Sequence, residues 1–136
     1  MKIIIYGINY APEEVGIGKY TTELAEWLSS RGNQIKVITA CSYYPNWSVK
    51  KNKYFQERIN CVDVQRCPLW VPQKPSGIKR LIHLASFVLT SLPILFSLKR
   101  FKADLIITIA PALFCAPVSI LFKIINKRAK NWIHIQ

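Results

Sequence analysis

The chain has 136 residues, of which 51% are hydrophobic and 19% are charged. This composition can bury a sizeable core, so it excludes a disordered tail, a collagen-like chain and a disulfide-stapled mini-protein, and the length suits one domain. Nineteen Lys and Arg oppose seven Asp and Glu, which gives a net charge of +12. This excess of basic residues indicates an anionic partner, whether a phosphorylated small molecule, nucleic acid or an acidic membrane surface.

The cysteine pattern and the first residues indicate a protein of the cytoplasm. Cys41, Cys61, Cys67 and Cys115 form no C-x-x-C pair and no spacing typical of zinc ligands. We therefore expect reduced thiols rather than a disulfide framework. The apolar run at residues 1–6 is too short for a signal peptide.

Alternating strand and helix patterns predict a Rossmann-like α/β fold, with a parallel sheet flanked by helices. Residues 2–6 form a β-branched apolar run that ends at Gly7, which is typical of a buried parallel strand. A helical period begins at Lys19 and ends near Gly32, and a strand follows a tight turn, so this unit is a right-handed crossover. The remaining predicted elements are strands at 34–39, 61–66, 104–109 and 131–135, a long loop at 41–60, a proline-marked segment at 68–75 and a helix from 111 to 125.

The segment from residue 81 to residue 98 is apolar and has basic residues at both ends. Twelve of its 18 residues are apolar, and it contains no acid, Lys or Arg. If it is helical, His83, Ser86, Thr90 and Ser97 fall on one stripe. Three interpretations stay open: a core helix that covers the sheet, a helix that dips into one membrane leaflet with its ends on phosphates, and a transmembrane span. The flanking bases are Lys79, Arg80, Lys99, Arg100 and Lys102.

The sequence Gly16-Ile17-Gly18 lies between the first predicted strand and the first predicted helix. Backbone N–H groups and the helix dipole favour a phosphate at such a position. The spacing departs from the dinucleotide fingerprint and from the P-loop, because Thr21 and Glu13 stand where those motifs have glycine. The loop therefore either approaches a phosphorylated ligand or only shapes a tight turn.

Two histidines and an aromatic, basic loop are the other candidates. His134 lies near the carboxyl end of the last predicted strand, where it would contact a substrate hydroxyl or serve only structure, and His83 is a weaker candidate. Tyr43, Tyr44 and Trp47 interleave with lysines, either to stack nucleic-acid bases or, as we favour, to border an acceptor cleft. The sequence has no metal-ligand cluster, paired catalytic carboxylates or nucleophile elbow, so any chemistry would be group transfer assisted by positioning and electrostatics.

Several blocks resemble one family of enzymes over the whole chain. Residues 1–13 read MKIIIYGINYAPE, and GIGKY at 16–20 and ELAEWL at 23–28 follow. These blocks are similar to the amino-terminal domain of family 4 glycosyltransferases with the GT-B architecture, and more closely to the colanic-acid type of bacterial exopolysaccharide synthesis. Further similar blocks are RCPLWVP at 66–72, KRLIHLASF at 79–87, APALFCAP at 110–117 and HIQ at 134–136.

The resemblance implies a retaining transferase that passes a sugar from a nucleotide-sugar donor to a glycan on a polyprenyl diphosphate lipid. Residues 1–136 would be its amino-terminal, acceptor-side domain. A carboxyl-terminal domain would grip the nucleotide with an Arg/Lys pair and an E-x7-E motif, and no E-x7-E pair occurs in this sequence. We therefore expect half of a larger enzyme, inactive alone, whose facing wall lies beyond the last strand.

The resemblance also assigns roles to particular residues. Gly16 and Gly18 match a glycine loop that approaches the donor phosphates and the transferred sugar, although Ile17 splits the usual glycine pair. His134 matches a histidine that contacts the sugar near its reacting carbon. The residues implied in acceptor or membrane contact are Tyr43, Tyr44, Trp47, Lys79, Arg80, Lys99 and Arg100.

The partners that the resemblance implies follow from these roles. They are the nucleotide-sugar donor, the lipid-linked acceptor, an anionic membrane surface and the carboxyl-terminal domain, with no nucleic acid, metal or other cofactor. Such an enzyme would be cytoplasmic and peripheral at the inner face of the cell membrane. The alternative is a non-catalytic module of the same fold that binds membranes or polyanions.

Overall fold

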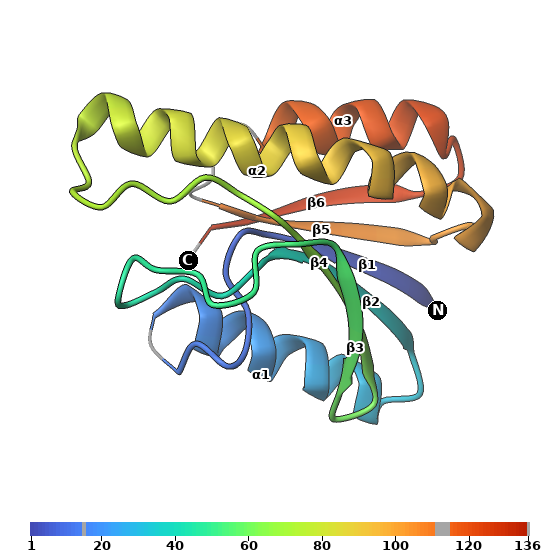
Figure 1. Ribbon diagram of the computed structural model, residues 1–136. Helices are drawn as coiled ribbons and strands as arrows, with labels where there is room; N and C mark the ends of the chain where they lie inside the picture. The colour runs from blue at the N-terminus through green and yellow to red at the C-terminus, as the bar shows by residue number, and fades with distance from the viewer. Residues whose placement is uncertain (15, 111–114, 136) are drawn as a thin grey trace.

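The computed structural model describes residues 1–14, 16–110 and 115–135, which form three layers (Figure 1). One helix covers one face of a six-stranded sheet, and two helices cover the other face. The predicted Rossmann-like α/β fold is thereby confirmed. The elements are β1 (Lys2–Tyr6), α1 (Ile17–Ser30), β2 (Gln34–Ala40), β3 (Phe55–Ile59), β4 (Val62–Cys67), α2 (Gly77–Ser97), the 3-10 turn η1 (Leu98–Phe101), β5 (Leu105–Ala110), α3 (Cys115–Ile125) and β6 (Lys130–Ile135).

The centre of the sheet consists of parallel strands made of apolar runs. The strand order is β3-β4-β2-β1-β5-β6, and β1 pairs in parallel with both β2 and β5. Ile3, Ile4 and Ile5 are almost completely buried, as expected for a strand that is covered on both faces. The five predicted strands are confirmed, and each of their ends lies within one residue of its predicted position.

The predicted loop at 41–60 is wrong at its end, where residues 55–59 form β3. This strand pairs antiparallel with β4, so the sheet is parallel except at this edge. Asn60 and Cys61 connect the two strands with φ angles of 46° and 66°, as a two-residue hairpin turn requires. The middle of β3 is polar and exposed, so it lacks the hydrophobic alternation that would have predicted a strand.

Helix α2 corresponds to the apolar segment at 81–98, and it packs on the sheet along one side. Its polar stripe bonds to the backbone that follows β4. His83 Nδ1 donates to the Trp70 carbonyl at 2.7 Å, and Ser86 Oγ accepts from the Trp70 N–H at 2.9 Å. Thr90 Oγ1 donates to the Pro68 carbonyl at 2.6 Å. Three of the four predicted stripe residues therefore face the protein and hold the first two thirds of the helix, whereas Ser97 is exposed and bonds to the Ile94 carbonyl of its own helix.

A proline lies inside α2 without separating the helix from the sheet. Pro93 has no N–H for the carbonyl of Leu89. One residue further along, the Tyr54 hydroxyl donates to the Thr90 carbonyl at 2.6 Å, which joins the helix to the loop after β2. Residues 77–101 are long and apolar enough to cross a membrane by length and composition, but these bonds hold the helix on the protein and oppose the transmembrane interpretation.

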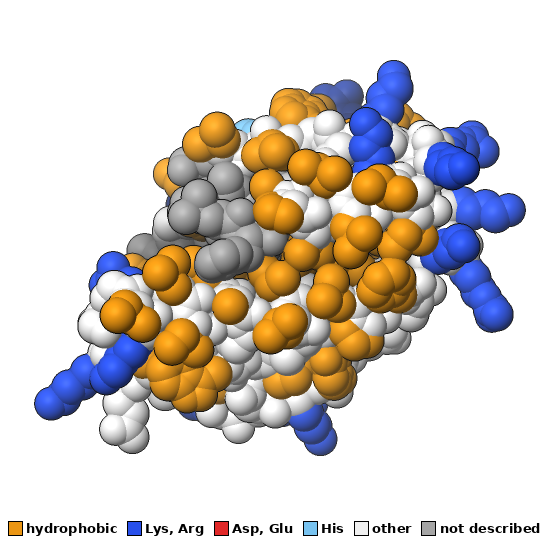
Figure 2. Space-filling view, turned by 90° about the horizontal axis from the view of Figure 1, so that it is seen from above, with side chains coloured by type: hydrophobic (Ala, Val, Ile, Leu, Met, Phe, Trp, Pro, Cys, Tyr) orange, Lys and Arg blue, Asp and Glu red, His pale blue; other side chains and the backbone are white. Residues whose placement is uncertain are grey.

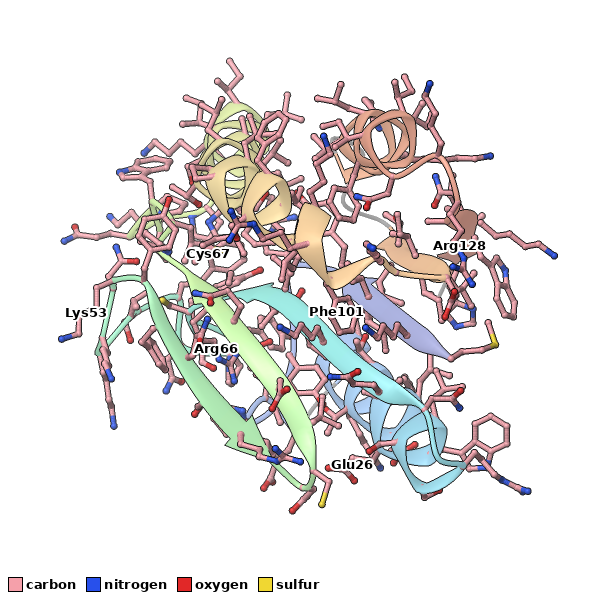
Figure 3. The ribbon with its side chains drawn as sticks, turned by 90° about the vertical axis from the view of Figure 1, so that its right-hand side faces the viewer. Glu26, Lys53, Arg66, Cys67, Phe101 and Arg128 are labelled. Carbon is pink, nitrogen blue, oxygen red and sulfur yellow. The ribbon has the colours of Figure 1, made fainter. Side chains whose placement is uncertain are left out.

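Arg66 is a buried cation that joins three parts of the chain (Figure 3). Its Nε donates to Glu57 on β3 at 2.7 Å. One terminal nitrogen donates to the Ala40 carbonyl at the end of β2 at 3.1 Å, and the other donates to the Ala11 carbonyl in the loop after β1. The guanidinium thus fixes the position of both loops at the carboxyl end of the sheet.

Replacing Arg66 with Met should destabilise the fold strongly. Met nearly keeps the volume of the Arg66 side chain, but the Ala11 and Ala40 carbonyls lose their donor. We therefore expect the free energy of unfolding to fall by about 2–4 kcal/mol. Urea denaturation followed by circular dichroism measures this change. The control is Arg58→Met, because the exposed pair of Arg58 and Asp63 at 3.6 Å should contribute less than about 0.5 kcal/mol. Equal losses for the two variants would contradict this role of Arg66.

Candidate functional site

The loops that follow β1, β2 and β4 gather at the carboxyl ends of these strands. In open parallel sheets, ligands bind outside this edge, at the place where the strand order reverses. Here the order reverses at β1, since β2 lies on one side of it and β5 on the other. The loops at 7–16, 41–54 and 68–76 therefore define the candidate site. Residues 111–114, which follow β5, lie outside the described residues.

The predicted glycine loop leads directly into α1. Gly16 has a φ angle of 59°, a conformation that residues other than glycine rarely adopt, and it precedes the first helical residue. A Cβ added to Gly18 would lie 2.9 Å from the Cβ of Glu13 and 3.0 Å from its carbonyl oxygen. Gly18 therefore allows the loop to fold back onto the helix. This packing supports the turn-shaping interpretation of Gly18, while the exposed end of α1 at Gly16 stays suited to an anion.

Glu13 is a buried carboxylate that connects the loops after β1 and β2. Its Oε1 accepts from the backbone N–H groups of Tyr43 and Tyr44, both at 3.2 Å. Its Oε2 accepts from Asn9 Nδ2 at 2.7 Å. Burial raises the pKa of Glu13, whereas these hydrogen bonds and the nearby Arg66 oppose the increase. Sequence reasoning missed this residue because its backbone partners Tyr43 and Tyr44 lie 30 and 31 residues away in the chain.

Tyr43, Trp47 and His83 form an aromatic cluster at the same edge. The His83 ring lies 4.5 Å from the Tyr43 ring and 5.4 Å from the Trp47 ring, measured between centroids. Burial raises the pKa of Tyr43 to about 12, so its hydroxyl stays protonated. The Arg80 guanidinium lies 5.9 Å from the centroid of the Trp47 ring, which is a cation–π arrangement. The structure thus brings together three of the predicted acceptor contacts, and it adds His83.

His83 is held in its neutral form with one ring nitrogen unused. Because the Trp70 carbonyl can only accept, the proton of the neutral ring is on Nδ1. Nε2 is buried and has no hydrogen-bond partner among the described residues. Burial lowers the pKa of His83. The imidazole therefore presents a hydrogen-bond acceptor next to two aromatic rings.

The other predicted contacts are dispersed over the molecule. Tyr44 is exposed and follows Tyr43 of the cluster, and Lys79 lies in the first turn of α2 next to Arg80. Lys99 and Arg100 lie in η1, which follows the opposite end of α2, so they do not belong to this edge of the sheet.

His134 lies on β6, at the edge of the sheet. It is opposite Ile109 on β5, so it is near the carboxyl ends of the strands, as predicted. Its ring lies 6.2 Å from the Trp132 ring, edge to face. Strand β5 separates β6 from β1, and thus separates His134 from the strand that leads to the glycine loop.

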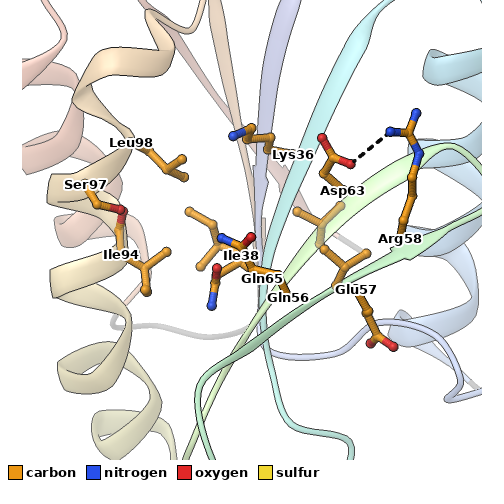
Figure 4. Close-up of a pocket in the computed structure, with 12 residues that line it drawn as sticks. Lys36, Ile38, Gln56, Glu57, Arg58, Asp63, Gln65, Ile94, Ser97 and Leu98 are labelled. Atoms are coloured by element: carbon orange, nitrogen blue, oxygen red, sulfur yellow. Dashed lines mark hydrogen bonds and ion pairs between the residues drawn. The ribbon is translucent and has the colours of Figure 1, made fainter.

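Two cavities differ in their relation to the site. One, of about 370 Å³, lies at the loops and is bordered by Tyr43, Tyr44, Lys50 and Lys51. The other, of about 410 Å³, lies between the sheet and the carboxyl end of α2 (Figure 4). Its lining includes Lys36 and Asp63 near the beginnings of β2 and β4, and among the described residues it meets the first cavity only at Glu57, which borders both. In the described part of the chain, no three His, Cys, Asp or Glu side chains are grouped to hold a metal.

Gly18→Ala should strain the loop that carries Glu13. The added methyl group would overlap Glu13, so we expect the free energy of unfolding to fall by about 1–3 kcal/mol. Gly77→Ala is the matched control, because a Cβ there meets nothing within 4 Å and Ala favours a helix. Thermal unfolding of both variants measures the difference, and equal stability would show that the loop is not closely packed on α1.

Acidification should destabilise the protein through His83. Its pKa in the folded state lies below the ordinary value of 6.5, so below about pH 6.5 the unfolded chain binds the additional proton more readily. The stability is therefore complete above that pH and decreases as the pH falls, by up to about 1.4 kcal/mol per pH unit. Denaturation between pH 7.5 and 5.5 tests this expectation. His83→Asn keeps a donor for the Trp70 carbonyl but does not titrate, so a variant with the same pH dependence would disprove the assignment.

The chain is similar to a bacterial glycosyltransferase over its whole length. No known protein-family profile matches it. It is 48% identical to WcaI, a colanic acid biosynthesis glycosyl transferase of Escherichia coli (strain K12), and this match covers 100% of the chain and 34% of WcaI. The chain therefore spans about one third of this curated relative.

Two solved structures share the fold at low sequence identity. The catalytic domain of starch synthase IV from Arabidopsis thaliana, solved with ADP and acarbose, superposes with a TM-score of 0.72 at 17% identity over 99% of this chain and 33% of that one. Sucrose-phosphate synthase from Thermosynechococcus elongatus gives a TM-score of 0.59 at 15% identity over 98% of this chain and 32% of that one. The sequence similarity to WcaI confirms the resemblance to colanic-acid-type glycosyltransferases, and the fold of the chain is one found in GT-B glycosyltransferase catalytic domains.

Proposed function

We propose that residues 1–136 are the acceptor-side, amino-terminal domain of a retaining glycosyltransferase. The enzyme transfers a sugar from a nucleotide-sugar donor to a glycan on a polyprenyl diphosphate lipid in bacterial exopolysaccharide synthesis. The observation that carries this proposal is the 48% identity to WcaI over the entire chain. The glycosyltransferase fold and the aromatic and basic loops at the carboxyl ends of the strands support it.

In this proposal, donor and acceptor meet at the carboxyl edge of the sheet. The amino-terminal end of α1 at Gly16 approaches the donor phosphates, with Ile17 and Gly18 shaping the loop. His134 contacts the transferred sugar. Tyr44 and Trp47 border the acceptor and supply an apolar surface for its glycan. Arg80, beside the Trp47 ring, supplies a cation for its diphosphate.

The reaction itself is a group transfer. The bond between the sugar's anomeric carbon and the donor phosphate oxygen breaks, the acceptor hydroxyl oxygen forms the new bond to that carbon, and the hydroxyl proton passes to the leaving diphosphate. The nucleotide diphosphate leaves with the bonding electrons, so cationic groups of a carboxyl-terminal domain stabilise its charge. No metal or cofactor is needed for this step in our proposal, and the complete enzyme works at the inner face of the cell membrane.

Sugar transfer by the full-length enzyme tests the proposal. The assay supplies radiolabelled nucleotide-sugars and a water-soluble, short-chain diphosphate acceptor, so that membrane binding does not influence the result. We expect His134→Ala to lower kcat by roughly 10²-fold, because a group that contacts the reacting sugar is lost. Trp47→Ala should instead raise the KM for the acceptor.

The control is Trp27→Ala, which removes an equally large exposed ring from α1, outside the site. It should leave both kinetic constants unchanged. Absence of transfer with every nucleotide-sugar supplied, or unchanged kinetics for both His134→Ala and Trp47→Ala, would refute the proposed function. A non-catalytic binding module would give the first of these results.

A further inference from the structure

The outer surface of α2 and α3 is apolar and exposed (Figure 2). Seen from the side of these two helices, hydrophobic side chains extend over most of the face, and basic side chains project at its ends. Ile78 is 74% exposed and Leu89 is 65% exposed. We call this surface the outer helix face, and its members are Ile78, Leu81, Ile82, Leu89 and Phe96 of α2 with Ile120, Leu121 and Ile124 of α3.

Helix α2 has apolar side chains on both its buried side and its exposed side, and its polar residues lie on the buried side. A helix on a soluble domain normally buries its apolar side and exposes its polar side. In α2, the polar residues His83, Ser86 and Thr90 bond to the backbone of the segment after β4, and Ser91 bonds to the Tyr6 hydroxyl at 2.7 Å. Phe87 and Leu95 complete the buried side. The side chains that α2 exposes to the outside are therefore mainly apolar.

The charges around the outer helix face have one sign. Between residues 64 and 136, the sequence has eleven Lys and Arg but one acid, Asp104. Asp104 accepts from the backbone N–H of Lys2 at 2.8 Å and pairs with Arg128 at 3.5 Å, at the opposite edge of the sheet from the candidate site. Within the described residues, Lys79, Arg80, Lys99, Arg100 and Lys123 form no ion pair with an acid.

We propose that the outer helix face lies in the headgroup region of an anionic bilayer, with α2 parallel to the membrane plane. Its apolar side chains enter the acyl boundary, and the basic residues at both ends of α2 contact lipid phosphates. The inference rests on the proposed function, because a lipid-linked acceptor brings the enzyme to a bilayer. To the proposed function, this inference adds which surface binds the bilayer, that α3 takes part, and that α2 lies parallel to the membrane.

The hydrogen bonds of α2 determine this orientation. A transmembrane arrangement would break the bonds to Tyr6, Tyr54, Pro68 and Trp70 and would leave their buried polar groups without partners. Lying flat, α2 keeps all of these bonds and still inserts its apolar side chains. Only 22% of its most apolar 18-residue window is buried in the protein, so most of that window remains available to lipid.

Charge decides between a bilayer and a protein partner. Protein interfaces commonly pair basic groups with acidic ones, and here the face and its ends offer basic groups alone. The 21 residues of α2 give a helix about 30 Å long. An anionic leaflet is wide enough to place negative charge at both of its ends. The candidate site then lies close to the membrane surface, since Arg80 belongs both to α2 and to the aromatic cluster.

Vesicle sedimentation with the full-length protein tests the inference. The vesicles contain either phosphatidylglycerol with phosphatidylethanolamine, or phosphatidylcholine alone. The apolar variant Leu81→Ser/Leu89→Ser/Phe96→Ser should bind the anionic vesicles at least roughly tenfold more weakly, because three side chains no longer enter the bilayer. The matched control is Tyr20→Ser/Trp27→Ser on α1, whose rings are 58% and 55% exposed, and it should bind as the unmodified protein does.

A second pair of variants tests the role of the charges. Lys79→Gln/Arg80→Gln/Lys99→Gln/Arg100→Gln should lose at least roughly tenfold in affinity for anionic vesicles, and its binding should depend less on salt. Lys19→Gln/Arg31→Gln, in the first turn and at the C-cap of α1, is the control. Binding of phosphatidylcholine vesicles should be weak for every one of these proteins.

Three results would overturn the inference. The first is that the apolar variant binds anionic vesicles as strongly as its control. The second is that the unmodified protein is a dimer by light scattering and the apolar variant a monomer with unchanged vesicle binding, which would assign the face to a second copy. The third is capture of the face by a protein partner in place of lipid. Sugar transfer to the soluble acceptor should be unchanged in the apolar variant, so a failure of the membrane surface is distinct from a failure of the proposed function.

Discussion

The hydrogen bonds between the polar stripe of α2 and the backbone after β4 are the constraint on which the rest of the structure depends. They satisfy backbone groups of Pro68 and Trp70, and they turn the polar side of an apolar helix toward the protein. The apolar side must then face outward. The same bonds place Arg80 and His83 beside Trp47, so the aromatic cluster depends on them as well.

Two buried ions of opposite charge organise the loops at the carboxyl edge in a complementary way. Arg66 joins the loop after β1 to the end of β2 and the middle of β3, while Glu13 joins the same loop to the backbone of Tyr43 and Tyr44. Most of their partners are backbone groups, which the chain can supply whatever the neighbouring side chains are. This arrangement allows loops without regular secondary structure to hold fixed positions around a site.

The sequence predicted the parts of the fold that depend on local hydrophobic pattern, and it missed those that depend on distant polar partners. The strands at 2–6 and 104–109 are continuous β-branched runs, so they were predictable, whereas β3 is polar because it is an exposed edge. In the site, Gly16 and Gly18 were recognisable from their place between strand and helix. Glu13 and Arg66 were not, because no short spacing encodes a carboxylate or guanidinium whose ligands come from other loops. The polar stripe on α2 was visible in the sequence. Which way it faces could not be predicted, because its partners are backbone groups in the segment at 68–70.

The distribution of acids has a consequence for how the molecule would approach a charged surface. Six of the seven acids lie in residues 1–63, while residues 64–136, which include both outer helices, contain eleven bases and one acid. Such a separation gives the domain a permanent dipole, so the field of an anionic leaflet would rotate it before contact and present its helical side first. Under the proposed function, adsorption would then confine the search for a lipid-linked acceptor to lateral diffusion in two dimensions.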